Sequence, residues 1–401
     1  MTSERIRTQV AIIGAGPAGS LMAHLLHRAG IESVVLERRS KEYVLGRIRA
    51  GVLEQSAADL LRAVGLGERM DAKGFRHGGV ALSHDLGSVR VDFQELVGRQ
   101  VTIWGQTEVQ ADLFAALEVS DVPLYDEAEG ATLHDLTTDQ PRVTFSRAGS
   151  DYEVLADWVV GCDGAHGPSR QAFPDEITRV YDRSYPFGWL GVLSETPPVS
   201  DELIYASHER GFALCSMRHA MLSRYYVQCD LEDTVDDWSD DRFWTELTAR
   251  LPEDAADRLV TGPSIEKSIT PLRSTVIEPM RHGRLLLAGD SAHIVPPTGA
   301  KGLNLAIADV ARCASALAAA LLRGDDRGVD TYSETALTRV WNAVRFSWWM
   351  TTLLHRFPER TGFDRKLQVA ELHHLGSSVH ARAALADNYT GLPFEVGEDF
   401  L

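Results

Sequence analysis

A glycine-rich turn near the N-terminus constrains the fold of this chain more than any other feature. The segment TQVAIIGAGPAGSLMAHLLHRAGIESVVLERR contains an apolar strand, the turn, a helix with apolar periodicity and a second strand, SVVLE. Two strands joined through a helix pair in parallel, which is the building unit of a doubly wound sheet. The chain is therefore expected to contain a Rossmann-like domain.

The turn also predicts a nucleotide site. Gly14, Gly16 and Gly19 form a GxGxxG pattern, and Glu37 lies at the end of the second strand. Glycine lets the backbone turn tightly and approach a pyrophosphate at the helix N-terminus, while the carboxylate can accept a hydrogen bond from a ribose 2′-hydroxyl. An acidic residue at that position favours adenosine without a 2′-phosphate, as in FAD or NAD.

A second constellation, LLLAGDSAHIVPPTGAKGLNLAIAD, favours FAD. Asp290 closes a strand and can bind a ribityl hydroxyl, two prolines stiffen the following loop, and TGAKGLN opens a long helix. Backbone N–H groups near Gly302, Leu303 and Asn304 are expected to be free at the start of this helix. A helix N-terminus stabilises a negative charge such as that of a reduced flavin.

Between about residues 185 and 270 strand-like stretches dominate, among them FGWLGVL, GFALCSM and SRYYVQCDL, with a helical insert at DDRFWTELTARL. The fold class expected is α/β, with a Rossmann-like FAD-binding domain, a second, mostly antiparallel β-sheet substrate domain and C-terminal helices. The expected boundaries are an FAD-binding domain at 1–180 that resumes at about 272–330, a substrate-binding domain at 181–271 that strands 75–98 join, and a helical region at 331–401.

Composition limits the partners. The chain has 401 residues, of which 44% are hydrophobic, so it can bury a large core. A net charge of −17 argues against nucleic acid and anionic membranes, because both need basic surfaces. Its four cysteines lie far apart without a CxxC pair, the N-terminus lacks the pattern of a signal peptide, and the most apolar helical run is too short to cross a bilayer. We expect a cytoplasmic protein with no metal site.

The segment LCSMRHAMLSRYYVQ is expected to form a β-hairpin that turns around residues 219–222. Because successive side chains on a strand point to opposite faces, Ser216 and Arg218 share one face of the first strand, and Arg224 and Tyr226 share one face of the second. Such a face can be a solvated surface, or it can supply a local basic pocket for an anionic small molecule. A guanidinium fork matches a carboxylate well.

Three motifs occur in order along the chain: GxGxxG, then Asp163–Gly164 within GCDGAHGPSR, then Gly289–Asp290. This ordered set resembles the single-component flavoprotein aromatic hydroxylases, in which all three motifs contact FAD. Further stretches, spread from Gln9 to about Phe394, are similar to the 4-hydroxybenzoate 3-hydroxylase family. They are YVLGRIRAGVLEQ, YPFGWLG, LIYA, GFALCSMR, SRYYVQ, VPPTGAKGLN, RFSWWMT and NYTGLP.

The resemblance implies a reaction. NADPH reduces FAD, O₂ then forms a C4a-hydroperoxyflavin, and the substrate 4-hydroxybenzoate becomes 3,4-dihydroxybenzoate. The family's substrate-binding positions match Ser216, Arg218, Arg224 and Tyr226, of which Arg224 also lies near the flavin. The family's catalytic positions, which move the phenol proton to solvent or face the substrate hydroxyl, match Tyr205, Tyr389, His77 and Pro297.

The resemblance also implies two cofactor sites. The FAD positions are Gly14, Gly16, Gly19, Glu37, Arg47, Arg49, Gln106, Asp163, Asp290, Gly299, Leu303 and Asn304. The chain has no second GxGxxG, so NADPH is expected in a surface groove formed by Arg38, Arg39, Tyr43, His166, Arg170 and Arg273. Relatives carry an uncharged residue where this chain has Arg39, which favours NADPH, although NADH stays possible.

Two alternatives remain open at this point. One is a hydroxylase of another para-hydroxylated aromatic acid, because one methylene more or less in the substrate changes the pocket without changing these motifs. The other is an FAD-binding sensor of aromatic acids that does not turn over. The aromatic content of the SWWM and HRFPERTG segments suits a homodimer, which the family usually forms.

Overall fold

The computed structural model describes residues 4–46, 51–84, 87–394 and 397–400. Its nucleotide-binding part is a six-stranded sheet in the order β19-β20-β13-β2-β3-β9. Four central strands and β9 run parallel, and only the edge strand β19 is antiparallel. The strands are β2 (Val10–Ile13), β3 (Ser33–Leu36), β9 (Leu124–Tyr125), β13 (Trp158–Gly161), β19 (Arg281–His282) and β20 (Leu285–Leu287). The expected doubly wound sheet is confirmed.

Buried strands in this sheet are continuous apolar runs because helices cover them, as a parallel sheet requires. Every residue of β2, β3 and β13 is buried. The covering helices are α1 (Pro17–Arg28), α6 (Gln106–Val119) and α10 (Gly302–Arg323). Among the described residues, α10 is the one helix long and apolar enough to cross a membrane, but 67% of its most apolar stretch is buried inside the protein.

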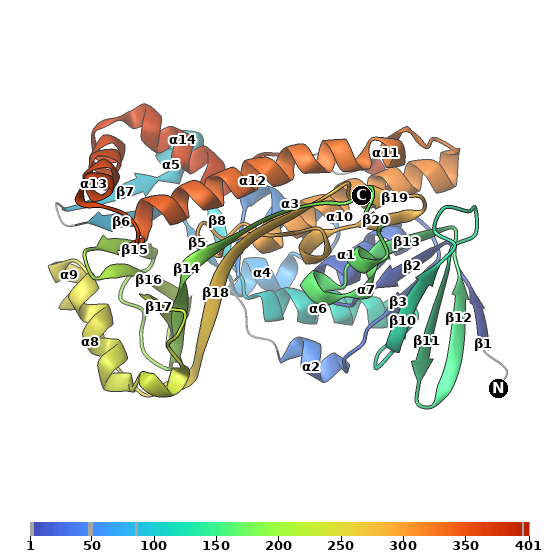
Figure 1. The fold of residues 1–401 in the computed structure, drawn as a ribbon, viewed down its shortest axis with the longest axis horizontal. Coiled ribbons are helices and arrows are strands. Elements are labelled where there is room, and N and C mark those ends of the chain that lie inside the picture. The colour runs from blue at the N-terminus through green and yellow to red at the C-terminus, as the bar shows by residue number, and fades with distance from the viewer. Residues whose placement is uncertain (1–3, 47–50, 85–86, 395–396, 401) are drawn as a thin grey trace.

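A second, eight-stranded sheet has the order β21-β18-β14-β17-β16-β15-β6-β7. It is mostly antiparallel, with one parallel pair between β15 and β6. Its strands are β6 (Gly79–His84), β7 (Gly87–Asp92), β14 (Arg179–Ser194), β15 (Leu203–His208), β16 (Gly211–His219), β17 (Leu222–Cys229), β18 (Ser264–Glu278) and β21 (His293–Ile294). Figure 1 shows β14 and β18 as a long ribbon that reaches from this sheet toward the nucleotide-binding sheet.

The two faces of the eight-stranded sheet bury two different cores. Alternation along β15 and β16 sends Tyr205, Phe212 and Leu214 into a core shared with the C-terminal helices, and sends Ile204 and Cys215 into a core under the helix α8. Cys215 is therefore a buried packing residue. The C-terminal helices are α11 (Arg327–Asp330), α12 (Tyr332–Leu354), α13 (Gly362–Ser377) and α14 (Val379–Thr390), and α8 spans Asp240–Arg250.

Smaller elements complete the chain. A four-stranded sheet that contains the N-terminal strand lies at one end of the molecule (Figure 1), and a three-stranded sheet has the order β4-β8-β5. Their strands are β1 (Glu4–Arg7), β10 (Glu129–His134), β11 (Arg142–Arg147), β12 (Ser150–Leu155), β4 (Val52–Leu53), β5 (Phe75–His77) and β8 (Val101–Ile103). The short helices are α2 (Lys41–Leu45), α3 (Gln55–Ala63), α4 (Glu68–Lys73), α5 (Phe93–Val97), α7 (Pro168–Gln171) and α9 (Glu253–Ala256).

Candidate active site

The glycine turn leaves room for a phosphate. Gly14 has φ +99°, a conformation that other residues rarely adopt, and a Cβ on Gly19 would lie 1.9 Å from the Gly14 carbonyl oxygen. Gly16 is the N-cap of α1, without a side-chain cap, and a Cβ there would meet no atom within 4 Å. The N-terminus of α1 is therefore uncapped by any side chain and has space beside it, as an anion site requires.

The two acidic positions expected at the nucleotide are held by backbone groups. Glu37 accepts hydrogen bonds from the N–H groups of Ala15 and Arg39, both at 2.8 Å, which fixes its carboxylate beside the glycine turn. Asp163 accepts a bond of 2.8 Å from the Ser169 N–H. Its other oxygen, Oδ1, is buried and has no partner in the described part of the chain, and burial raises the pKa of this carboxyl. An enclosed acceptor without a donor is a place for a ligand hydroxyl or N–H.

The start of α10 is a second uncapped helix N-terminus. Gly299 and Ala300 have φ values of +87° and +54°, and the N-cap residue, Lys301, makes no side-chain cap. Asp290 is exposed just before this loop, and Leu303 is partly exposed. The amides of this turn and the exposed carboxylate thus fit the flavin end of FAD, as the residues at α1 fit its pyrophosphate.

Asn304 and Gln106, two further residues predicted to contact FAD, have different surroundings in the structure. The Asn304 side chain is buried and ties the loop before α3 to α10, since it accepts a bond from the Glu54 N–H and donates one to the Val52 carbonyl, each 2.8 Å long. It can contact a cofactor only through its backbone. Gln106 is the first residue of α6 and is partly exposed. Arg47 and Arg49 lie outside the described residues.

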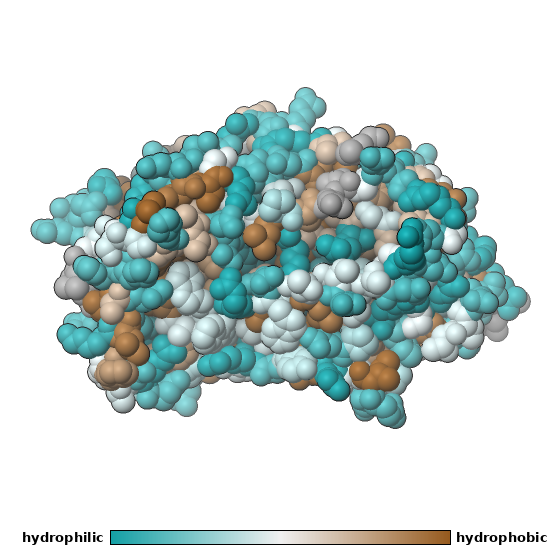
Figure 2. Space-filling model, turned by 90° about the horizontal axis from the view of Figure 1, so that it is seen from above, coloured by the Kyte–Doolittle hydropathy of each residue, from teal (hydrophilic) through white to brown (hydrophobic). Residues whose placement is uncertain are grey.

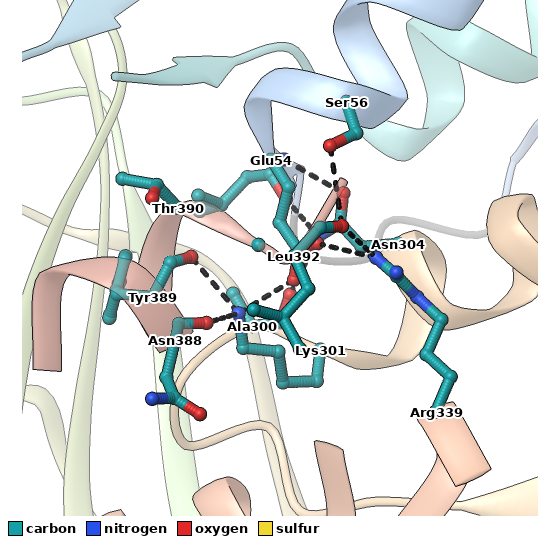
Figure 3. Close-up of polar contacts among 12 residues, drawn as sticks. Glu54, Ser56, Ala300, Lys301, Asn304, Arg339, Asn388, Tyr389, Thr390 and Leu392 are labelled. Atoms are coloured by element: carbon teal, nitrogen blue, oxygen red, sulfur yellow. Dashed lines mark hydrogen bonds and ion pairs between the residues drawn. The ribbon is translucent and has the colours of Figure 1, made fainter. Parts of the chain in front are cut away.

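A buried ion pair beneath this loop was missed by sequence reasoning (Figure 3). Lys301 Nζ lies 2.6 Å from Glu54 Oε1, and the two side chains are only 4% and 6% exposed. The same ammonium donates to the backbone carbonyls of Asn388 and Tyr389 at the end of α14. A lysine at a helix N-cap is unfavourable, because its positive charge lies at the positive end of the helix dipole. Such a lysine needs a nearby carboxylate, and this is the sequence signal that could have predicted an ion pair at Lys301.

Tyr205 and Tyr389 are brought together as expected. Their hydroxyl oxygens are 2.7 Å apart, and each side chain is 1% exposed. Burial raises the pKa of Tyr205 to about 12, and it also raises the pKa of Tyr389. Phe93 stacks on Tyr389 with ring centroids 5.1 Å apart. Both phenols therefore stay protonated and can pass a proton between them without holding a charge.

Within the described residues, neither His77 nor Pro297 makes a hydrogen bond to the tyrosine pair. His77, at the end of β5, is 2% exposed, and neither ring nitrogen has a hydrogen-bond partner among the residues described. Burial lowers its pKa, although the nearby carboxylates of Glu202 and Asp201 act in the opposite direction. Pro297 is exposed, and its carbonyl accepts a bond of 2.9 Å from the Ala300 N–H.

The expected hairpin is formed by β16 and β17, with Ser216 directly opposite Arg224 and Leu214 opposite Tyr226. A register shift between Met217 and His219 places Arg218 in an irregular stretch. Within the described ranges, Arg218 Nε is buried without a partner. The face of the hairpin therefore presents guanidinium, hydroxyl and phenol groups to the core that contains Tyr205, rather than to bulk solvent.

Arg224 has partners that the sequence did not reveal. Its Nη1 lies 2.9 Å from Glu266 Oε1, and its Nη2 donates a bond of 3.0 Å to Ser268 Oγ. Both partners belong to β18, two strands away. Gly191 on the intervening strand makes this reach possible, because a Cβ there would lie 2.9 Å from Arg224 Nη2.

The residues expected to hold NADPH lie on three separate segments. Arg38, Arg39 and Tyr43 follow β3, with the Arg39 guanidinium 5.1 Å from the Tyr43 ring centre. His166 is exposed, and Arg170 donates a bond of 2.6 Å to the Ala165 carbonyl. Two further guanidinium nitrogens of Arg170 are enclosed without a partner in the part of the chain that is described.

Arg273 is already engaged in this structure. It pairs with Asp182, and the Thr275 hydroxyl donates a bond of 2.6 Å to the same carboxylate. Burial lowers the pKa of Arg170, and the positive charge of Arg273 lowers it further. No contact between described residues joins this pair to Arg38 and Arg39.

Comparisons with known proteins agree with this geometry. Residues 7–347 match the model of the FAD binding domain family. The chain is 52% identical over 394 residues to the p-hydroxybenzoate hydroxylase of Acinetobacter baylyi, covering 98% of this chain and 97% of that protein. It is 28% identical to a probable NADH-specific resorcinol 4-hydroxylase of Rhodococcus jostii, over 82% of this chain and 62% of that protein.

Solved structures support the fold. The p-nitrophenol 4-monooxygenase of Pseudomonas putida superposes with a TM-score of 0.78 at 20% identity, covering 96% of this chain and 97% of that one. The expected fold class, FAD as cofactor and NAD(P)H as co-substrate are therefore confirmed. The chain belongs to the FAD binding domain family and, within it, to the FAD-dependent aromatic hydroxylases.

Proposed function

We propose that the protein hydroxylates 4-hydroxybenzoate to 3,4-dihydroxybenzoate with NADPH and O₂. The observation that carries this proposal is the buried pair of hydroxyls of Tyr205 and Tyr389, 2.7 Å apart, in the core faced by the hairpin with Arg218 and Arg224. One end of such a site suits a phenol and the other suits a carboxylate. The 52% identical relative is named for the same substrate.

The carboxylate end of the substrate binds to Arg218, Ser216 and Tyr226. Arg218 has an enclosed Nε without a partner in the described ranges, so a carboxylate oxygen satisfies it. Ser216 and Tyr226 supply hydroxyl donors on the same face. Arg224, which is held by Glu266 and Ser268, has a role at the flavin in this proposal.

The phenol end requires proton removal. Hydroxylation needs an electron-rich ring, and a free phenol with a pKa of about 10 is mostly protonated at neutral pH. Tyr205 accepts this proton as it passes its own to Tyr389, and His77 completes the route toward solvent. The carbonyl of Pro297, which accepts a bond from the Ala300 N–H, has a second lone pair that can accept a bond from the substrate hydroxyl. Bound FAD supplies the electron transfer from NADPH and the activation of O₂.

We infer that NADPH binds in the groove that contains Arg38, Arg39, Tyr43, Arg170 and Arg273. His166, which is exposed, belongs to the same predicted set. The enclosed nitrogens of Arg170 without partners in the described chain support an anion there. Two adjacent exposed arginines, Arg38 and Arg39, suit a 2′-phosphate and favour NADPH over NADH.

We also propose a cytoplasmic homodimer, in which the helical region supplies the interface. Large apolar side chains are exposed on α12 and α13. These side chains are Trp341, Trp348, Phe363 and Leu367. Separately, Figure 2 shows that the face seen from above is mostly hydrophilic, with small brown patches between. All four cysteines are free and buried, which suits a reducing compartment. We also propose the division of the chain into an FAD-binding, a substrate-binding and a helical region.

The test is NADPH oxidation by the FAD-loaded protein in air, with and without 4-hydroxybenzoate, followed by identification of the aromatic product. Strong stimulation with stoichiometric 3,4-dihydroxybenzoate is the expected result. Stimulation that yields only hydrogen peroxide would make 4-hydroxybenzoate an effector and point to another phenolic acid. Slow oxidation that ignores the ligand would favour a sensor.

A further inference from the structure

A cluster of charged side chains lies on the surface beside His77. Arg90 on β7 donates two hydrogen bonds to Glu202, from Nε to Oε2 at 2.7 Å and from Nη2 to Oε1 at 2.8 Å. The same guanidinium pairs with Asp92, the N-cap residue of α5. We call Arg90, Asp92 and Glu202 the rim cluster. None of them has a role in the site described above.

The rim cluster lies against the backbone that directly follows His77. A Cβ on Gly78 would lie 3.7 Å from Arg90 Nη2 and 3.8 Å from Glu202 Oε1, and a Cβ on Gly79 would lie 3.0 Å from the same Nη2. The two glycines therefore admit the ion pair to within contact of the chain. A larger residue at Gly79 would displace Arg90.

The same backbone also leads to Tyr389. The Phe93 N–H donates a bond of 2.6 Å to the Gly78 carbonyl, and the Phe93 ring stacks on Tyr389. One short stretch of chain thus connects the inner tyrosine pair, His77 and the rim cluster. The cluster is the point at which this stretch meets solvent, since the side chain of Arg90 is 49% exposed.

His77 is a buried imidazole without a hydrogen-bond partner among the described residues, and burial is the largest influence on its pKa, which it lowers. The carboxylates of Glu202 and Asp201, before β15, act in the opposite direction, and Glu202 is joined in the rim cluster by Arg90 on β7 and Asp92 at α5. Arg76, its neighbour on β5, is exposed and lies 3.6 Å from Asp71. The surroundings before β15, on β7 and at α5 thus hold three carboxylates and one guanidinium, and the excess negative charge partly offsets the lowering of the His77 pKa by burial.

We propose that the ion pair of Arg90 and Glu202 sets how readily His77 takes up the substrate proton, so that both residues are positioning residues for the outer end of the proton route. This inference rests on the proposed function, in which His77 receives that proton from Tyr389. The negative charge of Glu202 raises the proton affinity of His77. Arg90 weakens this effect because its positive charge pairs with Glu202 through two hydrogen bonds. Solvent then takes the proton from the exposed side of the cluster.

The two partners can be tested in opposite directions. Glu202→Gln removes a negative charge and leaves Arg90 positive, so the apparent pKa of proton release should fall by about half a pH unit, a shift typical of one partly exposed charge. Arg90→Gln removes the positive charge, so the same pKa should rise by a similar amount. The measurement is stopped-flow proton release with a pH indicator when 4-hydroxybenzoate binds to the FAD-loaded enzyme between pH 5.5 and 8.5.

Two further variants separate the possible failures. Asp135→Asn breaks a comparable surface pair with Arg142 on the four-stranded sheet and should leave the apparent pKa unchanged. His77→Asn should abolish this titration. If the titration survives in His77→Asn, the proposed proton route is wrong. If His77→Asn abolishes it but Glu202→Gln and Arg90→Gln cause no shift, or shift it in the same direction, the rim cluster does not tune His77 and the present inference is overturned.

Discussion

The tyrosine chamber and the arginine groove, which serve one reaction in the proposed function, differ in how far their side chains are exposed to water. We define the tyrosine chamber as Tyr205, Tyr389, Ser216, Arg218 and Arg224, and the arginine groove as Arg38, Arg39, Tyr43, Arg170 and Arg273. The chamber lies in a core between a sheet and three helices, and its two phenols are 1% exposed. In the groove Arg38, Arg39 and Tyr43 are exposed.

This difference in exposure determines how much each side chain contributes to binding and catalysis. Charges and hydrogen bonds in an enclosed site act through a low dielectric, so the loss of one partner leaves an unsatisfied group and a large penalty. Exposed charges are screened by water and salt, and single contacts contribute little. The chamber should therefore depend on individual residues, while the groove should depend on total charge.

Replacement of Tyr205 by phenylalanine should have the largest effect. The Tyr205→Phe variant loses the first acceptor of the phenol proton, and positioned acid–base groups contribute about 10²- to 10⁴-fold to rate. The flavin should still be reduced by NADPH, but most of the reducing equivalents should appear as hydrogen peroxide. Product and peroxide are quantified per NADPH consumed. Full coupling in this variant would place the proton route elsewhere.

Removal of Glu54 should have the next largest effect. Glu54→Ala leaves the buried ammonium of Lys301 without its carboxylate, and breaking a buried ion pair costs about 3–5 kcal/mol of unfolding free energy. Urea denaturation measures the change. The double variant Glu54→Leu with Lys301→Met is the control, because it removes both charges and should recover part of the loss. Equal stability of Glu54→Ala and the wild type would mean that water satisfies Lys301.

Removal of Arg218 should weaken substrate binding and spare FAD. Arg218→Ala loses a charge-assisted contact worth roughly 1.5–3 kcal/mol, so the Kd for 4-hydroxybenzoate should rise about ten- to a hundredfold. Titration of the flavin absorbance measures this Kd. Arg210→Ala, an exposed arginine paired with Glu246, serves as the control. Unchanged affinity would remove Arg218 from the chamber.

The smallest effect is expected in the groove. Arg39→Gln should lower kcat/KM for NADPH by no more than about fivefold and leave that for NADH nearly unchanged, because Arg39 is exposed and its charge is screened. The difference should shrink further as salt is raised. A specificity constant for NADH that equals or exceeds that for NADPH in the wild type would refute the predicted cofactor preference.

The sequence predicted the features that depend on neighbouring residues. The glycine turn, the strand that ends before Asp290 and the hairpin of β16 and β17 follow from local periodicity and turn chemistry. The register that puts Ser216 opposite Arg224 does not, because it depends on the irregularity between Met217 and His219. Tyr205 and Tyr389 are 184 residues apart, and only the family resemblance linked them. Local patterns define elements and faces, but they do not say which faces meet.

Contacts between distant segments were not predictable in this way. Lys301 and Glu54 are 247 residues apart, and Arg224 reaches Glu266 only because the intervening strand carries a glycine. The pairing of Arg273 with Asp182 connects two strands whose register shifts nearby. These pairs depend on long-range packing, and the residue types alone suggest only surface charge.

The paired strands β14 and β18 limit how the two proposed sites can move relative to each other. Arg273 of the groove and Glu266, the partner of Arg224, are on one strand, seven residues or about 23 Å apart at the usual rise of a strand. The proposed NADPH site and the proposed substrate site are thus attached to one strand, which cannot lengthen. Movement of these two sites relative to each other must bend the paired strands β14 and β18. The pairing is interrupted between Ser184 and Gly188, and bending should occur most easily there.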